Sequence, residues 1–410
     1  MLQPRAILLC LVLAQPAMAD TAADRFAPKR GLNFDIWNTW LSVEDMVTTP
    51  GFLDIYPDWR SIVAPNAIAG LSAMGFDFVR LPMDPAPLLR LGPGPAQDAL
   101  IDQIAETALM VQAAGLKTIV DLHSIPGPDE AWGTDSVVGD TALFAAYIAL
   151  TANVAARLNG MDPDRTALEL LNEPTSDCDS VWSGGPMTWP DQLIRLHRTA
   201  RKAAPDLPLV LSGACWGGVD GLKAIDPAAI ADNNVLWSFH SYEPFLFTHQ
   251  GASWTTGLNA LFTGITYPPT TIDDATAARL LSQAEGRLGT STNKDASPAA
   301  LAQELQNYRD RPADDVGTEI HAAAAWADQH GIPRGRLILG EFGAIRDDMT
   351  GSRLTGTGRA AFLKDKRTAA EALGIGWAVW GWTGAFGITD DDTTRAIAPD
   401  ICVALGLLQC

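Results

Sequence analysis

Short apolar runs recur along the chain, separated by longer stretches that carry apolar residues at helical spacing. The helical stretches end at typical stop signals: residues 97–114 stop at Gly115 and residues 141–158 at Asn159. Short runs bounded in this way are typical of β-strands. The strands predicted are 31–34, 78–81, 118–122, 167–171, 209–212, 235–239, 337–340 and 376–379.

Helical patterns fill most intervals between these strands, and the alternation predicts a parallel sheet with right-handed crossovers. Several strands are almost entirely apolar, as expected for strands buried on both faces. Eight such units predict an α/β fold closed into a (β/α)₈ TIM barrel. An open doubly wound sheet is the alternative, but no glycine-rich phosphate turn follows the first strand. The main helices predicted are 97–114, 141–158, 189–203, 320–329 and 358–373.

The interval after the sixth predicted strand is much longer than the others. It contains two further helical patterns, at 274–288 and 297–309. We interpret residues 246–315, approximately, as an insertion over the catalytic face. A separate small domain is the alternative, although the segment has few aromatics and little strand character. No linker is evident, so residues 20–410 are expected to form a single catalytic domain.

The N-terminus has the features of a secretory signal peptide spanning residues 1–19. Arg5 precedes a short apolar run, and Ala17-Met18-Ala19 provides small residues for cleavage near Asp20. The apolar run is too short to span a bilayer, although an uncleaved anchor is the alternative. We therefore expect a secreted or periplasmic protein without a membrane span.

Four cysteines remain after cleavage, at positions 178, 215, 402 and 410. An even count in an oxidising compartment indicates disulfides, and four cysteines allow three pairings. Closeness in sequence favours Cys402 with Cys410. Adjacent barrel strands favour Cys178 with Cys215. A zinc site is the alternative, but no close cysteine pair has histidines nearby.

The acidic net charge of the chain limits the classes of molecule that it is expected to bind. The formal net charge of −19 becomes −20 when the signal, with one arginine and no acid, is removed. Such a surface repels phosphate backbones and polyanionic glycans, so no nucleic acid partner is expected. Sequence motifs for zinc proteases and serine hydrolases are lacking. His197, His321 and His330 fall in helical patterns and are expected at the surface.

Polar residues gather where the predicted strands end, which is where catalytic groups lie in this architecture. Two of them are carboxylates, Glu173 and Glu341. Such a pair can flank a glycosidic bond if one is protonated and the other ionised. Arg80 and Tyr242 could hold Glu341 as a carboxylate. The full set is Asn33, Arg80, His123, Asn172, Glu173, Trp216, His240, Tyr242, Glu341 and Trp380.

These motifs together resemble glycoside hydrolase family 5, the large cellulase family. The resemblance rests on Arg30-Gly31-Leu32-Asn33, Gly75-Phe76-Asp77-Phe78-Val79-Arg80-Leu81-Pro82, Asp121-Leu122-His123, Leu171-Asn172-Glu173-Pro174, Trp237-Ser238-Phe239-His240-Ser241-Tyr242, Leu339-Gly340-Glu341-Phe342-Gly343 and Trp380 with Phe386-Gly387-Ile388. It implies a retaining double displacement with Glu173 as general acid/base and Glu341 as nucleophile. The resemblance also implies that no metal or other cofactor takes part.

The resemblance also implies that Arg80, His123, Asn172, His240 and Tyr242 line the central sugar site. Trp380 would stack on a sugar face, and Asn33 and Trp37 are further candidates for substrate binding. Phe34-Asp35-Ile36-Trp37 and Ser124 depart from the family pattern and leave the glycan open.

The 13 tryptophans suit an extended glycan cleft. We expect a monomeric endo-β-1,4-glucanase acting on a polysaccharide or oligosaccharide. The alternatives are a β-mannanase, a β-1,3-glucanase or an exopolysaccharide-specific glycanase, and more remotely a non-catalytic glycan-binding barrel.

Overall fold

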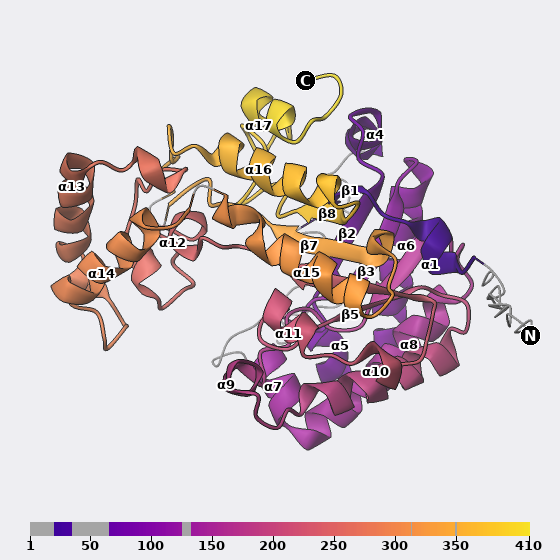
Figure 1. The fold of residues 1–410 in the computed structure, drawn as a ribbon. Helices are drawn as coiled ribbons and strands as arrows, with labels where there is room; N and C mark the ends of the chain where they lie inside the picture. Colours follow the sequence, from indigo (N-terminus) through magenta and orange to yellow (C-terminus); the bar gives the residue numbers. More distant parts are fainter. Residues whose placement is uncertain (1–19, 35–64, 125–132, 313, 349–350) are drawn as a thin grey trace, which may run out of the picture.

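The protein is a closed barrel of parallel strands, drawn in Figure 1. The computed structural model describes residues 20–34, 65–124, 133–312, 314–348 and 351–410. The first strand pairs with the last, which confirms the predicted (β/α)₈ barrel and rules out the open sheet. The strands are β1 (Arg30–Asn33), β2 (Phe78–Met83), β3 (Lys117–Leu122), β4 (Thr166–Glu169), β5 (Leu209–Ser212), β6 (Val235–His240), β7 (Leu337–Phe342) and β8 (Gly376–Val379).

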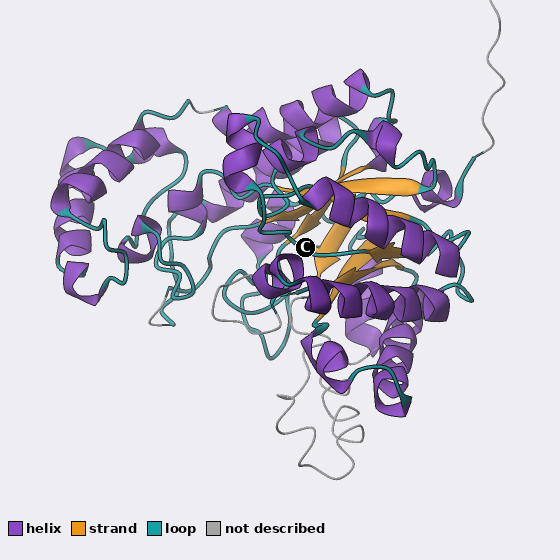
Figure 2. Cartoon of the chain, turned by 90° about the horizontal axis from the view of Figure 1, so that it is seen from below, coloured by secondary structure: helices purple, strands orange, loops and turns teal. Residues whose placement is uncertain are grey.

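Helices surround the barrel on its outer side, as Figure 2 shows. Their apolar faces pack on the outward side chains of the strands in one large core. Asp140 begins one of them by accepting backbone N–H bonds from Ala142 and Leu143, both at 2.8 Å. The helices are α4 (Pro65–Ala73), α5 (Ala86–Leu91), α6 (Pro95–Ala113), α7 (Thr134–Gly139), α8 (Thr141–Leu158), α9 (Cys178–Ser183), α10 (Trp189–Ala203), α11 (Val219–Lys223), α15 (Thr318–Gln329), α16 (Arg359–Ala372) and α17 (Pro399–Ala404).

The helix α8 is the one described segment long and apolar enough to cross a membrane by length and composition. It packs beside α6, α7 and α10 in the helical layer, with Phe144, Tyr147 and Val154 buried. These contacts are those of a core helix of the barrel.

The barrel interior is built in layers because side chains on a strand alternate in direction. The lower layer is apolar and forms its own cluster, separate from the core beneath the helices. β1 contributes Gly31, where a Cβ atom would lie 2.3 Å from the Phe78 ring. Two residues further along each strand the next layer is largely polar, so the barrel passes from an apolar floor to a polar rim. The apolar layer contains Phe78, Ile119, Ala167, Val210, Leu236, Ile338 and Ala378.

A short helix, α1 (Ala22–Phe26), closes the floor of the barrel. Ala23 and Phe26 are fully buried in the lower interior cluster. Asp24 holds the helix from outside by a 2.7 Å ion pair with Arg336. This helix was not predicted, because its apolar residues contact the barrel and show no helical repeat of their own.

The insertion predicted after the sixth strand contains three helices: α12 (Phe245–Thr248), α13 (Asp274–Glu285) and α14 (Pro298–Arg309). In Figure 1 they project to the left of the barrel. α13 packs against α14, and Tyr308 donates a 2.7 Å hydrogen bond to the carbonyl of Thr266. The insertion joins the carboxyl end of the barrel, because the N–H of Ile345 after β7 donates to the carbonyl of Thr248.

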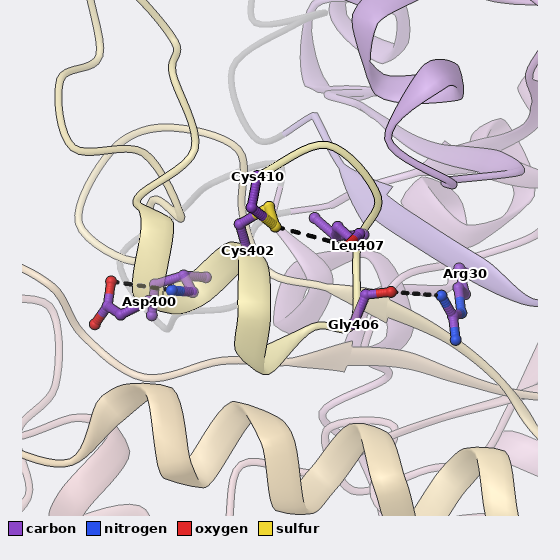
Figure 3. Close-up of a disulfide and its surroundings, with 7 residues drawn as sticks. Arg30, Asp400, Cys402, Gly406, Leu407 and Cys410 are labelled. Atoms are coloured by element: carbon purple, nitrogen blue, oxygen red, sulfur yellow. Dashed lines mark hydrogen bonds between the residues drawn. A yellow bond between two sulfur atoms is a disulfide. The ribbon is translucent and has the colours of Figure 1, made fainter.

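Two disulfides are present, and they are the favoured pairs: Cys178–Cys215 and Cys402–Cys410. The second closes the C-terminal tail after α17, as Figure 3 shows. Arg30 of β1 donates a 2.8 Å hydrogen bond to the carbonyl of Gly406 within this tail. The tail is therefore fastened both to its own helix and to the barrel.

The expectation that His197 lies at the surface was wrong. His197 on α10 is only 5% exposed, and its Nε2 lies 2.7 Å from Asp232. The ion pair between Asp232 and Arg201 explains why a polar ring is tolerated there. His321 and His330 are exposed as expected.

Replacing Phe26 by Ala should lower the free energy of unfolding by about 3–5 kcal/mol, because the loss of this buried ring would leave a cavity at the floor of the barrel. Chemical denaturation measures the change. Leu109→Ala on α6, where the side chain is 50% exposed, is the control and should change stability by less than about 0.5 kcal/mol. Equal effects would show that α1 does not contribute to the core.

Candidate active site

The site is organised around one buried arginine. Arg80 on β2 is 0% exposed and contacts three carboxylates. Its guanidinium nitrogens lie 2.9 Å from Asp121, 2.7 Å from Glu169 and 2.6 Å from Glu341. These acids come from β3, β4 and β7, so a single cation joins both sides of the barrel.

The same surroundings set the protonation of the acids. Burial opposes the positive charge of Arg80, but the three carboxylates keep its pKa well above the usual value. Burial raises the pKa of Asp121 to about 7, against the lowering effect of Arg80. Burial also raises the pKa of Glu169, again opposed by Arg80. A permanent cation thus coexists with acids whose pKa values burial holds above their usual values.

Two amides complete the contacts of Arg80. Asn33 accepts from Arg80 at 3.1 Å and donates to the carbonyl of Gly340 at 3.0 Å. Asn172 accepts from Arg80 at 2.8 Å, and its Nδ2 lies 3.3 Å from His123 Nε2. Both side chains are almost completely buried. Asn33 therefore joins β1 to β7, whereas Asn172 joins Arg80 to His123.

Glu341 is held from three directions. Its Oε1 accepts from Arg80, and its Oε2 accepts a 2.8 Å hydrogen bond from the hydroxyl of Tyr242. His240 Nδ1 lies 3.6 Å from the same Oε2. The expectation that Arg80 and Tyr242 contact this carboxylate agrees with these distances.

Glu173 lies opposite, in a different environment. Its backbone φ is +41°, a conformation that costs energy for a non-glycine residue and is common at functional sites. Burial raises its pKa to about 7, against the lowering effect of His123. One carboxylate oxygen each of Glu173 and Glu341 and one His240 nitrogen lie within 4.8 Å of one another.

His240 links the two glutamates. Its Nδ1 lies 2.7 Å from Glu173 Oε1, and burial lowers its pKa to about 4. The ring is therefore neutral near pH 7. When Glu173 is protonated, its hydroxyl donates to Nδ1. When Glu173 is ionised, Nδ1–H donates instead, so this contact suits either state of the acid.

An aromatic face borders the pair. The rings of Trp380 and His123 are stacked, with centroids 5.3 Å apart and 11° between their planes. Asp121 fixes the His123 ring through a 2.6 Å contact with Nδ1, and burial lowers the pKa of His123. Trp380 is partly exposed directly after β8. Trp37 lies outside the described residues.

The loop that carries Glu173 is fastened to the next loop. The Cys178–Cys215 disulfide joins them, and the N–H of Trp216 donates 2.9 Å to the carbonyl of Pro174. Cys215 and Trp216 both have positive φ, of 54° and 62°. These bonds hold the strained turn at Glu173, and the indole of Trp216 remains 48% exposed.

A second buried network supports the site from behind. Lys366 on α16 is 0% exposed and donates to the hydroxyl of Ser241, which donates to Glu319 on α15. The N–H of Ser241 donates 3.0 Å to the carbonyl of Glu341. Burial lowers the pKa of Lys366 to about 8, against the raising effect of Glu319. This network fixes the backbone between His240 and Tyr242.

Among the described residues, the triad Glu173, His240 and Glu341 is also the group whose atoms could hold a metal ion. Two of its members already have partners: Nδ1 of His240 faces Glu173, and Arg80 lies 2.6 Å from Glu341. A permanent cation on the same carboxylate opposes the binding of a second one. The donor set therefore fits a metal poorly.

Glu173 and Glu341 lie at the carboxyl ends of barrel strands, in different environments and beside the ring of Trp380. Glycosidases have this arrangement of two carboxylates. A family model named Cellulase (glycosyl hydrolase family 5) matches residues 42–386. The chain belongs to this family, which confirms the resemblance drawn from its motifs.

Curated relatives share about 30% of their residues with the chain, or less, over the matched part. The chain is similar to cellodextrinase A of Ruminococcus flavefaciens, at 30% identity over 48% of the chain and 56% of the relative. It is also similar to endoglucanase 3 of Fibrobacter succinogenes, at 27% identity over 67% of the chain and 37% of the relative. The chain thus spans about half, or less, of the length of these relatives.

Solved structures share the fold. A hyperthermophilic endo-β-1,4-glucanase in complex with substrate superposes with a TM-score of 0.63 at 18% identity, over 94% of the chain and 100% of that structure. Endoglucanase Cel5A from Thermotoga maritima gives 0.60 at 19% identity, over 94% and 100%. At these identities the likeness concerns the fold.

The site contains residues that the sequence did not mark as part of it. Asp121 appeared only within a motif, and Glu169 was not among the candidate residues. Both lie two residues beyond an interior apolar position, Ile119 and Ala167, and that spacing was a usable signal. Glu319 and Lys366 lie on helices, where no local pattern distinguishes them from surface charges.

Removing the Cys178–Cys215 bond by a double serine substitution should destabilise the protein by about 4 kcal/mol, since it closes a loop with sequence separation 37. It should also lower glycan hydrolysis, because the turn at Glu173 loses its brace. Denaturation midpoints and turnover measure the two effects.

The double serine variant of Cys402 and Cys410 is the matched control. Its bond spans a separation of 8, so the expected loss is about 2.5 kcal/mol with unchanged turnover. If turnover falls in the control but not in the variant without Cys178–Cys215, the disulfide beside Glu173 has no catalytic consequence.

Proposed function

We propose that the protein is a retaining endo-β-glycosidase whose preferred substrate is a β-1,4-linked glucan. The observation that carries the proposal is the placement of Glu173 and Glu341, with one oxygen of each within 4.8 Å. Retaining enzymes hold their carboxyl groups about 5–5.5 Å apart, whereas inverting enzymes need about 6.5–9.5 Å to admit water between them. The short separation favours direct attack by a carboxylate.

The environments of the two acids support separate roles. Glu341, beside Arg80 and Tyr242, is suited to the ionised nucleophile. Glu173, whose pKa burial raises to about 7, is suited to donating a proton. Environments that differ in this way allow one carboxyl group to act as base and the other as acid at the same pH.

In the first step, a Glu341 oxygen bonds to the anomeric carbon as the glycosidic bond breaks. Glu173 passes its proton to the departing oxygen, which leaves as a free hydroxyl. In the second step, water attacks the same carbon, Glu173 takes its proton, and Glu341 is released as carboxylate. His240 remains neutral and hydrogen-bonded to Glu173 in both states.

The central sugar is expected to lie against the partly exposed ring of Trp380, near His123 and Asn172. Apolar sugar faces stack on such rings, and the amide Nδ2 of Asn172 can donate to the 2-hydroxyl. Arg80, Asn33 and Asp121 would hold these groups in position, since they are buried beneath them. Trp37 remains a further proposed contact.

The glycan is proposed from the relatives. Those described above are a cellodextrinase and an endoglucanase, which favours a β-1,4-glucan. A Thermotoga maritima Cel5A structure is described in complex with mannotriose, so β-mannan is the second candidate. A screen of purified protein on both polymers, with product sizes recorded, distinguishes them.

Export is part of the proposal. Two disulfides are consistent with an oxidising compartment. We propose that residues 1–19 are a cleaved signal, although they lie outside the described residues. The remaining chain, 20–410, is proposed to work as a single catalytic domain and as a monomer.

Glu173→Gln should lower turnover of β-1,4-glucan by about 10²–10⁴-fold, because a general acid is lost. The loss in kcat/KM should be much smaller on an aryl cellobioside whose leaving group needs no proton, whereas kcat should stay low because the second step still needs Glu173 as base. Glu341→Gln should abolish turnover of both substrates, because no covalent intermediate can form. Steady-state kinetics on the two substrates measure this difference.

Glu243→Gln is the matched control. Glu243 is also a rim carboxylate, but it pairs with Arg311 at 2.7 Å, away from Arg80. Its turnover should stay near that of the wild type. Near-normal activity in Glu341→Gln would contradict the assignment of the nucleophile.

The rate should fall on the alkaline side as Glu173 loses its proton. Because burial raises the pKa of Glu173 to about 7, kcat/KM should drop about tenfold per pH unit above that value. The protonated form is the active acid, so the limb descends with rising pH. In Glu173→Gln with the aryl substrate this limb should disappear, and its persistence would assign it to another group.

A further inference from the structure

His240 has a second ring nitrogen that the proposed reaction does not use. Its Nδ1 lies 2.7 Å from Glu173, but its Nε2 is buried and has no hydrogen-bond partner among the described residues. Burying a polar atom without a partner is costly, and nearly all such atoms in folded proteins have one. The surroundings of Nε2 should therefore supply a group that hydrogen-bonds to it.

The hydroxyl of Ser238 is a second buried group of this kind, and it borders the same space. On β6, Ser238 and His240 follow the interior residue Leu236 at steps of two, so both side chains point into the barrel. Ser238 is 1% exposed, and its Oγ also lacks a partner in the part of the chain that the structure describes. A Cβ atom on Gly340 of β7 would lie 2.4 Å from this Oγ and 3.1 Å from His240 Nε2. Both polar atoms thus face the α-carbon of Gly340.

An irregularity in the pairing of β6 with β7 places the glycine there. Phe239 pairs with Leu339. The next residue, His240, pairs with Glu341, so Gly340 is an extra residue on β7, as in a β-bulge. The bulge changes the alternation of side chains along β7, which lets the Glu341 carboxylate point into the barrel. Glycine at the extra position leaves open the space that a side chain would fill.

We propose that one water molecule binds over Gly340 and joins Ser238 Oγ to His240 Nε2, which makes Ser238 a positioning residue for the pair of His240 and Glu173. A hydroxyl and a water molecule can each donate or accept, so together they serve Nε2 with or without its proton. A carbonyl or a backbone N–H in the same place would fit one tautomer only. The inference rests on the proposed function, because it assigns a support to the imidazole that contacts the general acid.

The tautomer of His240 is coupled to the charge of Glu173. When Glu173 is protonated, its hydroxyl donates to Nδ1, and the ring proton lies on Nε2. When the pair has released one proton to solvent, Glu173 is an anion and the ring proton lies on Nδ1. Because a buried N–H without an acceptor is especially unfavourable, loss of the Ser238 hydroxyl should disfavour the Nε2–H form and, with it, protonated Glu173.

Other charged and titratable groups face this pair, and they stay the same in the variants of Ser238. Burial lowers the pKa of His240, against the raising effect of Glu341. Burial raises the pKa of Glu173, against the lowering effect of His123. The groups that face the pair from β2, β3, β4, β7 and the segment after β6 are Arg80, Asp121, His123, Glu169, Glu341 and Tyr242.

The test is the pH dependence of kcat/KM on β-1,4-glucan. In Ser238→Ala the alkaline limb, expected at about pH 7 in the wild type, should move lower by about one pH unit. Gly340→Ala keeps the hydroxyl but fills the space with a methyl group, and its limb should move in the same direction. A limb that stays in place in either variant, once the variant is shown to be folded, would overturn the inference.

Ser212→Ala is the matched control. Ser212 on β5 is the register partner of Ser238 and is 2% exposed, but its hydroxyl donates to the carbonyl of Leu171 at 3.1 Å. Its alkaline limb should coincide with that of the wild type. An equal shift in Ser212→Ala and Ser238→Ala would overturn the inference, since the loss of any buried hydroxyl in this layer would then explain the effect.

Nitrogen-15 NMR of histidine-labelled protein reads the tautomer without turnover. The His240 signals should change from the Nε2–H to the Nδ1–H form across the alkaline limb, at a lower pH in Ser238→Ala than in the wild type. An alkaline limb that belongs to Glu173 but does not move in Ser238→Ala contradicts this inference alone. A protein that hydrolyses no glycan, but whose His240 midpoint moves in Ser238→Ala, contradicts the proposed function alone.

Discussion

The structure of the site depends on one buried interaction, that of the Arg80 guanidinium with Asp121, Glu169 and Glu341. Burying an unpaired charge costs several kcal/mol, so neither this cation nor these acids would be tolerated alone. Together they turn the polar layer of the barrel into one connected unit. Because Arg has a planar array of donors and keeps its proton, it can hold several carboxylates at once. The Glu341 carboxylate is thereby held in a fixed direction, with Tyr242 on its other oxygen.

Glu173 lies outside that unit, and the contrast gives the two glutamates different chemistry. It receives no direct contact from Arg80, and burial raises its pKa to about 7. Its neutral neighbour His240 serves either protonation state. The turn that presents it is strained, with φ of +41°, and is held by the neighbouring disulfide loop. Bonds made elsewhere in the same loops thus offset the energetic cost of the strained backbone at Glu173.

The sequence was sufficient to predict the barrel because apolar runs and helix stops are local signals. All eight strands were found, although β4 ends at Glu169 and not at residue 171 as predicted. Glu173, Glu341 and their contacts could be proposed because catalytic groups follow strand ends. The spacing of Asp121 and Glu169 from Ile119 and Ala167 could place both acids inside the barrel, but their contact with Arg80 depends on the stagger of the strands, which no local pattern specifies. The same holds for Lys366 and Glu319, which both contact Ser241 because α16 and α15 pack against each other and against β7.

The most direct test of the account is to trap the proposed covalent intermediate. A 2-fluoro-substituted cellobiosyl donor with a good leaving group slows the second step more than the first, and peptide mass spectrometry locates the sugar. The account predicts one cellobiosyl group per chain, attached to the peptide that contains Glu341 and absent in Glu341→Gln. Attachment to Glu173, or hydrolysis of the natural glucan with inversion and no labelled peptide, would contradict it.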